Sequence, residues 1–104
     1  MDINVQEPYF SFLKNGQKTI EGRLGKKKWL QLKKDENLIV NKSLKLKISR
    51  ITKYKSFEEM LIFEGIKNAI PDKKNLKDAV NVYRKFYSIE DEKKYGVVAV
   101  KVRK

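Results

Sequence analysis

The chain has 104 residues, enough for one domain with a modest core, and its formal net charge is +12. It contains no cysteine, which excludes disulfides and thiolate chemistry, and no histidine, which removes the most common general base and metal ligand. We therefore expect one domain over residues 1–104, with no metal and no cofactor. The sequence has no apolar run of the roughly 20 residues that span a bilayer, and its first residues lack the layout of a secretory signal. We expect a cytoplasmic protein without a membrane partner.

The positive charge is concentrated in the middle of the chain. Residues 14–55 hold 14 basic and 3 acidic side chains, whereas residues 56–104 hold 11 basic and 8 acidic ones. A basic region of this kind is typical of proteins that bind polyanions such as nucleic acids. Because 21 of the 25 basic residues are lysines, a merely solvated lysine-rich surface is the alternative interpretation.

The first half of the chain predicts four strands, over residues 2–6, 18–24, 36–40 and 43–54. A helix over residues 7–16 separates the first two strands, and Gly16 fits the left-handed position that ends it. Residues 25–29 are expected to form a basic loop. The longest strand loses its apolar alternation near residues 49–50, which predicts a bulge or a sharp bend there.

The second half predicts three helices, over residues 56–65, 75–87 and 88–96, and a closing strand over residues 97–102. Ser56 and Glu59 have the spacing of a capping box at the start of the first of these helices. The closing strand is apolar except for Lys101, which is typical of a central strand. Strands at both ends of the chain, with helices mainly between them, indicate an α+β fold.

The stretch "GQKTIEGR", residues 16–23, carries the pattern G-x-K-x-x-E-x-R. Gly16 lets a ligand approach the backbone closely, and Lys18 lies where it can aim its ammonium group into a cleft. Arg23 offers a planar fork for phosphate, and a lysine beside Glu21 can move protons or orient a polar ligand. The alternative is purely structural: a glycine that ends a helix, followed by a strand with a solvated Glu–Arg pair.

Several residues outside the motif could complete a binding surface. Three lysines, Lys26, Lys27 and Lys28, form a positive rim beside the motif. Trp29 can stack on a base or pack in the core, and the core is favoured. Tyr54, Tyr83 and Tyr87 have the same two alternatives, with packing in the core or at the rim favoured.

The motif, together with the tail "YRKFYSIEDEKKYG" at residues 83–96, resembles the ASCH domains (activating-signal-cointegrator homology domains) of the PUA-like superfamily. The resemblance covers nearly the whole chain. It implies a PUA-like β-barrel of about five to six strands with flanking helices, and a cleft beside the Gly-x-Lys loop for RNA or a nucleotide. We expect a monomer that binds such a ligand through these residues: Gly16, Lys18, Arg23, Lys26, Lys27, Lys28 and Tyr54.

The same resemblance leaves an enzymatic alternative open. Some small ASCH-like proteins resemble amidohydrolases of N4-acetylcytidine and others resemble ribonucleases, and Lys18 matches the lysine that both use. In this alternative Lys18 and Glu21 are the catalytic pair that transfers a proton. Glu64 is a candidate for the mid-chain acid of the hydrolases. Glu21 stands where those hydrolases have a threonine nucleophile, so the motif favours binding over catalysis.

Overall fold

In the computed structural model, which describes residues 1–104, a five-stranded sheet carries six helices. The strands are β1 (Asp2–Ile3), β2 (Ile20–Leu24), β3 (Asn37–Val40), β4 (Leu44–Tyr54) and β5 (Val97–Arg103). The helices are α1 (Tyr9–Asn15), α2 (Lys27–Leu30), α3 (Phe57–Glu64), α4 (Ile66–Ala69), α5 (Leu76–Arg84) and α6 (Ile89–Tyr95). The predicted α+β class is confirmed.

The strands are arranged in the order β1-β3-β4-β5-β2, with β1 parallel to β3 and the other neighbours antiparallel. β5 lies between β4 and β2, which confirms that the apolar closing strand is internal to the sheet. The pairing of β4 with β5 shifts register between Ile48 and Arg50, as the lost alternation predicted. Such a bulge increases the local twist and bends the strand.

The sheet is not closed, which corrects the expectation of a β-barrel. β1 and β2 form its two edges, and no backbone ladder joins them. β1 is only two residues long, and the chain then leaves the sheet for α1, so too little strand remains to pair with β2. A single side-chain bond spans the opening, from Arg23 Nη2 to the carbonyl oxygen of Asn4 at 3.0 Å.

Two short helices were not predicted. α2 replaces the expected loop after β2, and α4 follows directly on Gly65. Each has four residues, which is too short to show helical periodicity in a sequence. None of the helices is long and apolar enough to cross a bilayer.

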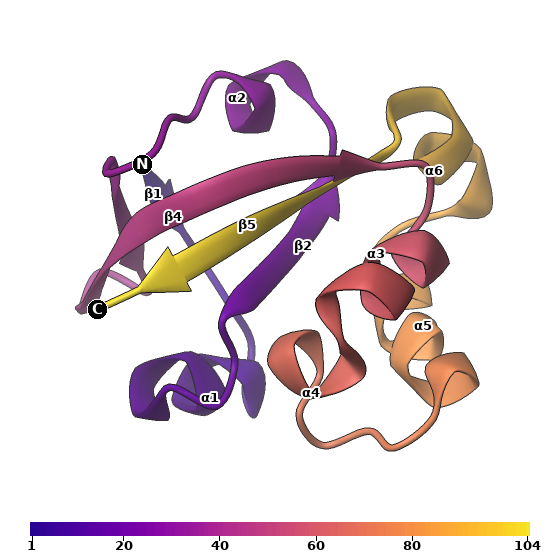
Figure 1. Ribbon diagram of the computed structural model, residues 1–104, viewed down its shortest axis with the longest axis horizontal. Helices are drawn as coiled ribbons and strands as arrows, with labels where there is room; N and C mark the ends of the chain where they lie inside the picture. The colour runs from indigo at the N-terminus through magenta and orange to yellow at the C-terminus, as the bar shows by residue number, and fades with distance from the viewer.

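The core lies on both faces of the sheet. One cluster packs the sheet against α3 and α5, where the Phe57 and Tyr83 rings stack with centroids 4.3 Å apart. The other cluster joins the opposite face to α1 through Leu13 and to α2 through Trp29. Trp29 is buried in this cluster, as favoured from the sequence. Figure 1 shows α3 to α6 gathered on one side of the molecule, with α1 and α2 near opposite ends of β2.

Candidate functional site

A cavity of about 280 Å³ lies at the free edge of β2. One wall comes from the segment after β1, between Asn4 and Tyr9, and another from the motif itself. The third wall comes from the helical half of the chain and includes Tyr83, Phe86 and Tyr87. The cavity therefore lies in the opening that keeps the sheet from closing.

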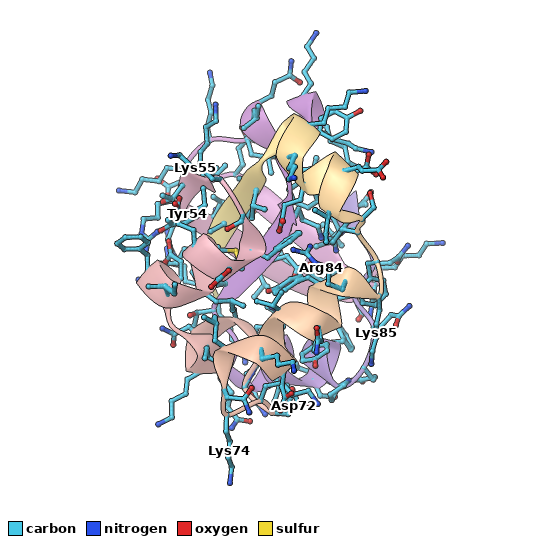
Figure 2. All side chains as sticks on the ribbon, turned by 90° about the vertical axis from the view of Figure 1, so that its right-hand side faces the viewer. Tyr54, Lys55, Asp72, Lys74, Arg84 and Lys85 are labelled. Carbon is cyan, nitrogen blue, oxygen red and sulfur yellow. The ribbon has the colours of Figure 1, made fainter.

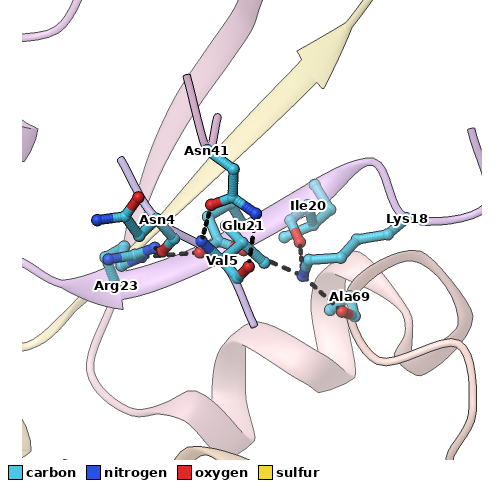
Figure 3. A network of polar contacts seen from close by, with 8 residues as sticks. All are labelled: Asn4, Val5, Lys18, Ile20, Glu21, Arg23, Asn41 and Ala69. Carbon is cyan, nitrogen blue, oxygen red and sulfur yellow. Dashed lines mark hydrogen bonds and ion pairs between the residues drawn. The ribbon is translucent and has the colours of Figure 1, made fainter. Parts of the chain in front are cut away.

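Lys18 lies in the wall of this cavity and is only 3% exposed. Its Nζ donates hydrogen bonds to the carbonyl oxygens of Ile20, at 2.5 Å, and Ala69, at 2.6 Å. Glu21 Oε1 lies 3.3 Å from the same nitrogen. An ammonium group has three N–H donors, and each has an acceptor here. Figure 3 shows this nitrogen between β2 and the helix end that carries Ala69.

Glu21 connects Lys18 to Arg23. Its Oε1 faces Lys18 Nζ, and its Oε2 accepts a hydrogen bond from Arg23 Nε at 2.8 Å. Burial alone would raise the pKa of Glu21, but the charges of Lys18 and Arg23 outweigh it and hold the pKa below the ordinary 4.5. Burial lowers the pKa of Lys18, and the Glu21 carboxylate opposes that shift. The three side chains form a cation–anion–cation row along the cavity.

Arg23 is fixed by contacts on three sides. Besides Glu21 it binds the carbonyl oxygen of Asn4, and its guanidinium group lies 5.1 Å from the centre of the Trp29 ring. These contacts orient the plane of the guanidinium group, and the Tyr87 hydroxyl group lies close enough to interact with it. Burial would lower the pKa of Arg23, but Glu21 outweighs that effect and the pKa lies above its ordinary value. Arg23 therefore remains a cation in the wall of the cavity.

Asn41 holds the segment that forms the first wall. The N–H of Val5 donates to Asn41 Oδ1 at 2.8 Å, and Asn41 Nδ2 donates to the Val5 carbonyl oxygen at 2.9 Å. The side-chain amide thus pairs with this segment as a neighbouring strand would. Asn41 adopts a left-handed conformation (φ +51°), which asparagine tolerates better than most residues. Figure 3 shows this pair next to Glu21 and Arg23.

Tyr83 lines the cavity and carries a buried hydroxyl group that lies beside Gly22. The residue is 6% exposed, and its hydroxyl oxygen is the one buried side-chain polar atom of the protein without a hydrogen-bond partner. Burial raises the pKa of this phenol well above 10.0, and the charge of Glu21 adds to the effect. An unpaired buried hydroxyl costs free energy, so its presence needs an explanation.

Lys26, Lys27 and Lys28 are exposed and do not line the cavity. Lys26 Nζ lies 5.2 Å from the centre of the Tyr95 ring, and Lys28 Nζ lies 5.7 Å from that of Trp29. The Trp29 ring contacts both Lys28 and Arg23, so α2 lies between these lysines and the cavity. They form a basic surface beyond the end of β2.

Gly16 and Tyr54 also lie outside the cavity lining. Gly16 ends α1 in the left-handed conformation, with φ +87°, as predicted. The Tyr54 hydroxyl donates to Glu64 Oε2 at 2.6 Å, and Arg50 binds both oxygens of the same carboxylate. Figure 2 shows Tyr54 and Lys85 at opposite margins of the helical face. Lys85 is the sequence neighbour of the cavity residue Phe86. Glu64, the candidate mid-chain acid, is thus held in this second cluster with Arg50 and Tyr54.

The sequence interpretation did not place most of the cavity wall. Gly22 and Phe86 were not proposed as ligand contacts, and core or rim packing was favoured for Tyr83 and Tyr87. Gly22 occupies a variable position of the motif, so the pattern gives it no weight. No group of three acidic residues lies close enough to hold a metal ion.

The comparisons with known proteins agree with this fold and motif. The ASCH domain family model matches residues 3–104. Hypothetical protein PH0355, whose crystal structure is known, has 45% sequence identity to this chain and a TM-score of 0.94. The match covers 98% of this chain and 95% of that one. The solution structure of protein PF0455 from Pyrococcus furiosus is 39% identical, with a TM-score of 0.83 and coverage of 98% and 94%. A search of curated proteins finds no match. The chain belongs to the ASCH domain family.

Proposed function

We propose that this ASCH domain binds single-stranded RNA or a nucleotide, with one nucleobase in the cavity at the edge of β2. The observation that carries the proposal is an aromatic cavity lined by the cation Arg23 and by Tyr83, whose buried hydroxyl group has no partner. The ASCH family is broadly linked to RNA binding, and the formal net charge of +12 favours a polyanion.

The walls of the cavity suit a flat aromatic ligand. Tyr9, Tyr83, Phe86 and Tyr87 line it, and Phe86 is 51% exposed. Bases of single-stranded RNA that are turned outward are commonly stacked on such side chains. A volume of about 280 Å³ is at the small end of ligand sites and fits one base rather than a duplex.

The charges near the cavity suit a phosphate group. Arg23 lines the cavity, and Trp29 and Glu21 hold the plane of its guanidinium group in place. Arginine binds phosphate through such a fixed fork. Lys26, Lys27 and Lys28 extend the positive surface along α2, where they would contact phosphates further along a strand.

Lys18 and Glu21 have a positioning role in this proposal. All three donors of Lys18 are occupied, and both oxygens of Glu21 face cations. A direct contact between Lys18 and a ligand, or a proton transfer by it, would first require one of these bonds to break. These contacts favour binding over the enzymatic alternative.

Fluorescence anisotropy with labelled single-stranded RNA tests the proposal. Wild-type protein is expected to bind, with an affinity that falls steeply as salt is added, because phosphate contacts release counterions. Arg23→Gln should weaken binding about tenfold or more and reduce the salt dependence by about one counterion. Lys67→Gln is the matched control, since Lys67 is an exposed cation on α4 outside the cavity.

Absence of RNA or nucleotide binding by the folded wild-type protein would overturn the proposal. If the Arg23→Gln and Lys67→Gln variants bind RNA with equal affinity, the cavity is not where the RNA binds. Circular dichroism spectra of both variants establish that each is folded before binding is compared.

A further inference from the structure

We infer that the backbone of Gly22 reads the base, by pairing its N–H and C=O with the hydrogen-bonding edge of the nucleobase. This inference rests on the proposed function and identifies what in the cavity recognises the ligand. It starts from the hydrogen bonds of β2. Figure 1 shows β2 at the edge of the sheet, with β5 on one side only.

The register of β2 against β5 fixes the direction in which each backbone group points. Gly22 lies opposite Ala99 in this antiparallel pair. In an antiparallel ladder, alternate residues turn N–H and C=O toward the partner strand, and the residues between them turn away. The N–H of Val102 donates to Thr19 O at 2.9 Å, and that of Gly25 donates to Gly96 O at 3.0 Å, so the Thr19 carbonyl group and the Gly25 N–H face the β5 side. By the same alternation, Gly22 turns its N–H and C=O away from β5.

On this outward side only Gly22 keeps both groups free. The carbonyl oxygen of Ile20 accepts from Lys18 Nζ, and that of Leu24 accepts from the N–H of Lys26 at 2.7 Å. Gly22 has no side chain, so it is its backbone that lines the cavity. One donor and one acceptor therefore lie next to each other in the cavity wall.

The surroundings of Gly22 are arranged around this backbone. A Cβ atom at position 22 would lie 2.8 Å from Met60 Cε and 3.1 Å from the Tyr83 hydroxyl oxygen. The absence of a side chain thus lets the Tyr83 hydroxyl group approach the strand. The three polar groups without partners, Gly22 N–H, Gly22 C=O and Tyr83 O–H, lie together in an otherwise largely aromatic site.

A nucleobase fits these groups better than a peptide strand. Each of the four bases carries a ring nitrogen next to an exocyclic group on its Watson–Crick edge, one a donor and the other an acceptor. This pair complements a single residue's N–H and C=O. An added peptide strand would need a longer run of free backbone, but the carbonyl groups of Ile20 and Leu24 on either side are occupied. The Tyr83 hydroxyl group, which donates or accepts, gives the base a third contact.

The test uses the whole chain and labelled RNA homopolymers of the four bases. The tightest-binding polymer is compared with one methylated at the Watson–Crick ring nitrogen and, as a matched control, with one methylated at a carbon atom or at the 2′-oxygen. We expect methylation of the Watson–Crick edge to weaken binding about tenfold or more, because it blocks both bonds to Gly22. The control methyl group should change affinity little.

The variant Tyr83→Phe provides a second test, because a purely structural role of the hydroxyl group would not predict weaker binding with unchanged stability. The hydroxyl group has no partner in the free protein, so its removal should leave the melting temperature unchanged or raise it. RNA affinity should nevertheless fall about fivefold. In ¹H–¹⁵N spectra, the Gly22 cross-peak, one of five from glycine, should shift downfield with the unmodified base only.

The outcomes separate this inference from the proposed function. If no RNA or nucleotide binds, both are overturned. If RNA binds but methylation of the Watson–Crick edge and Tyr83→Phe leave affinity unchanged, the reading by Gly22 is overturned and the proposed function stands. A Gly22 shift with an extended capped peptide, and none with nucleosides, would assign the edge to a peptide and overturn the inference.

Discussion

Replacing Lys18 with methionine removes the ammonium group from the centre of the site and keeps most of the side-chain volume. Three acceptors then lose their donor: the carbonyl oxygens of Ile20 and Ala69, and one oxygen of Glu21. Removing one partner of a buried ion pair costs about 3–5 kcal/mol, and each unsatisfied buried carbonyl group adds about 1 kcal/mol or more. Because these terms overlap, we expect a loss of about 4 kcal/mol.

A loss of that size is a large fraction of the roughly 5–15 kcal/mol that typically stabilises a domain, about a quarter or more. For a chain of this length it corresponds to a fall in melting temperature of roughly 15–30 °C. Thermal and urea unfolding followed by circular dichroism measure it. Lys67→Met is the control, since Lys67 is exposed and should contribute within about 0.5 kcal/mol.

The double variant Lys18→Met with Glu21→Gln sharpens this test. It removes the unpaired carboxylate that the single variant leaves buried, so it should recover part of the lost stability. If Lys18→Met lowers stability by no more than Lys67→Met does, the ammonium group is not held by three buried acceptors. The positioning role given to Lys18 would then be refuted.

Three further predictions concern stability and affinity away from Lys18. Glu21 and Glu64 have pKa values held below 4.5, so their contribution to stability is present above that pH and is lost as the pH falls through the lowered values. The free energy of unfolding, measured with urea, should therefore decline between pH 7 and pH 3, and Glu21→Gln should make this decline shallower. Tyr54→Phe should cost about 1 kcal/mol in the same assay, by removing the hydrogen bond to Glu64, yet leave RNA affinity within error in anisotropy. Replacing the three lysines of residues 26–28 with glutamine should weaken RNA binding at every sequence and lower the salt slope by about two to three, and an unchanged slope would exclude phosphate contacts there.

Much of the fold could be predicted because its signals are local. The bulge in β4 follows from the lost alternation near Arg50, and the internal position of β5 follows from its nearly unbroken apolar run. Gly16 was placed correctly at the end of α1 because a left-handed position favours glycine. The four-residue helices α2 and α4 could not be predicted, since one turn shows no periodicity.

The open edge of the sheet could not be predicted because closure depends on contacts between distant segments. β1 does not pair with β2 because it is only two residues long, and a hydrogen bond from Arg23 to Asn4 spans the gap instead. Neither feature appears in a local pattern. The motif correctly brought Lys18, Glu21 and Arg23 together, because their spacing places them along one short strand.

The direction of the Lys18 side chain was the part that the sequence could not supply. A lysine before a strand can point to solvent or inward, and the acceptor from Ala69 lies 51 residues further along the chain. The same holds for Tyr83, whose helical spacing favours the core. Its ring does pack there, while its hydroxyl group is buried beside Gly22 without a partner.

A map of backbone amide shifts on titration with short single-stranded RNA tests the central claim most directly. Shifts should concentrate in residues 4–9, 21–23 and 82–87, which enclose the cavity, and extend to residues 26–28. Residues around Tyr54 and Glu64 should remain unchanged. Shifts confined to that second cluster, or none at RNA concentrations that saturate binding, would contradict a base-binding cavity at the edge of β2.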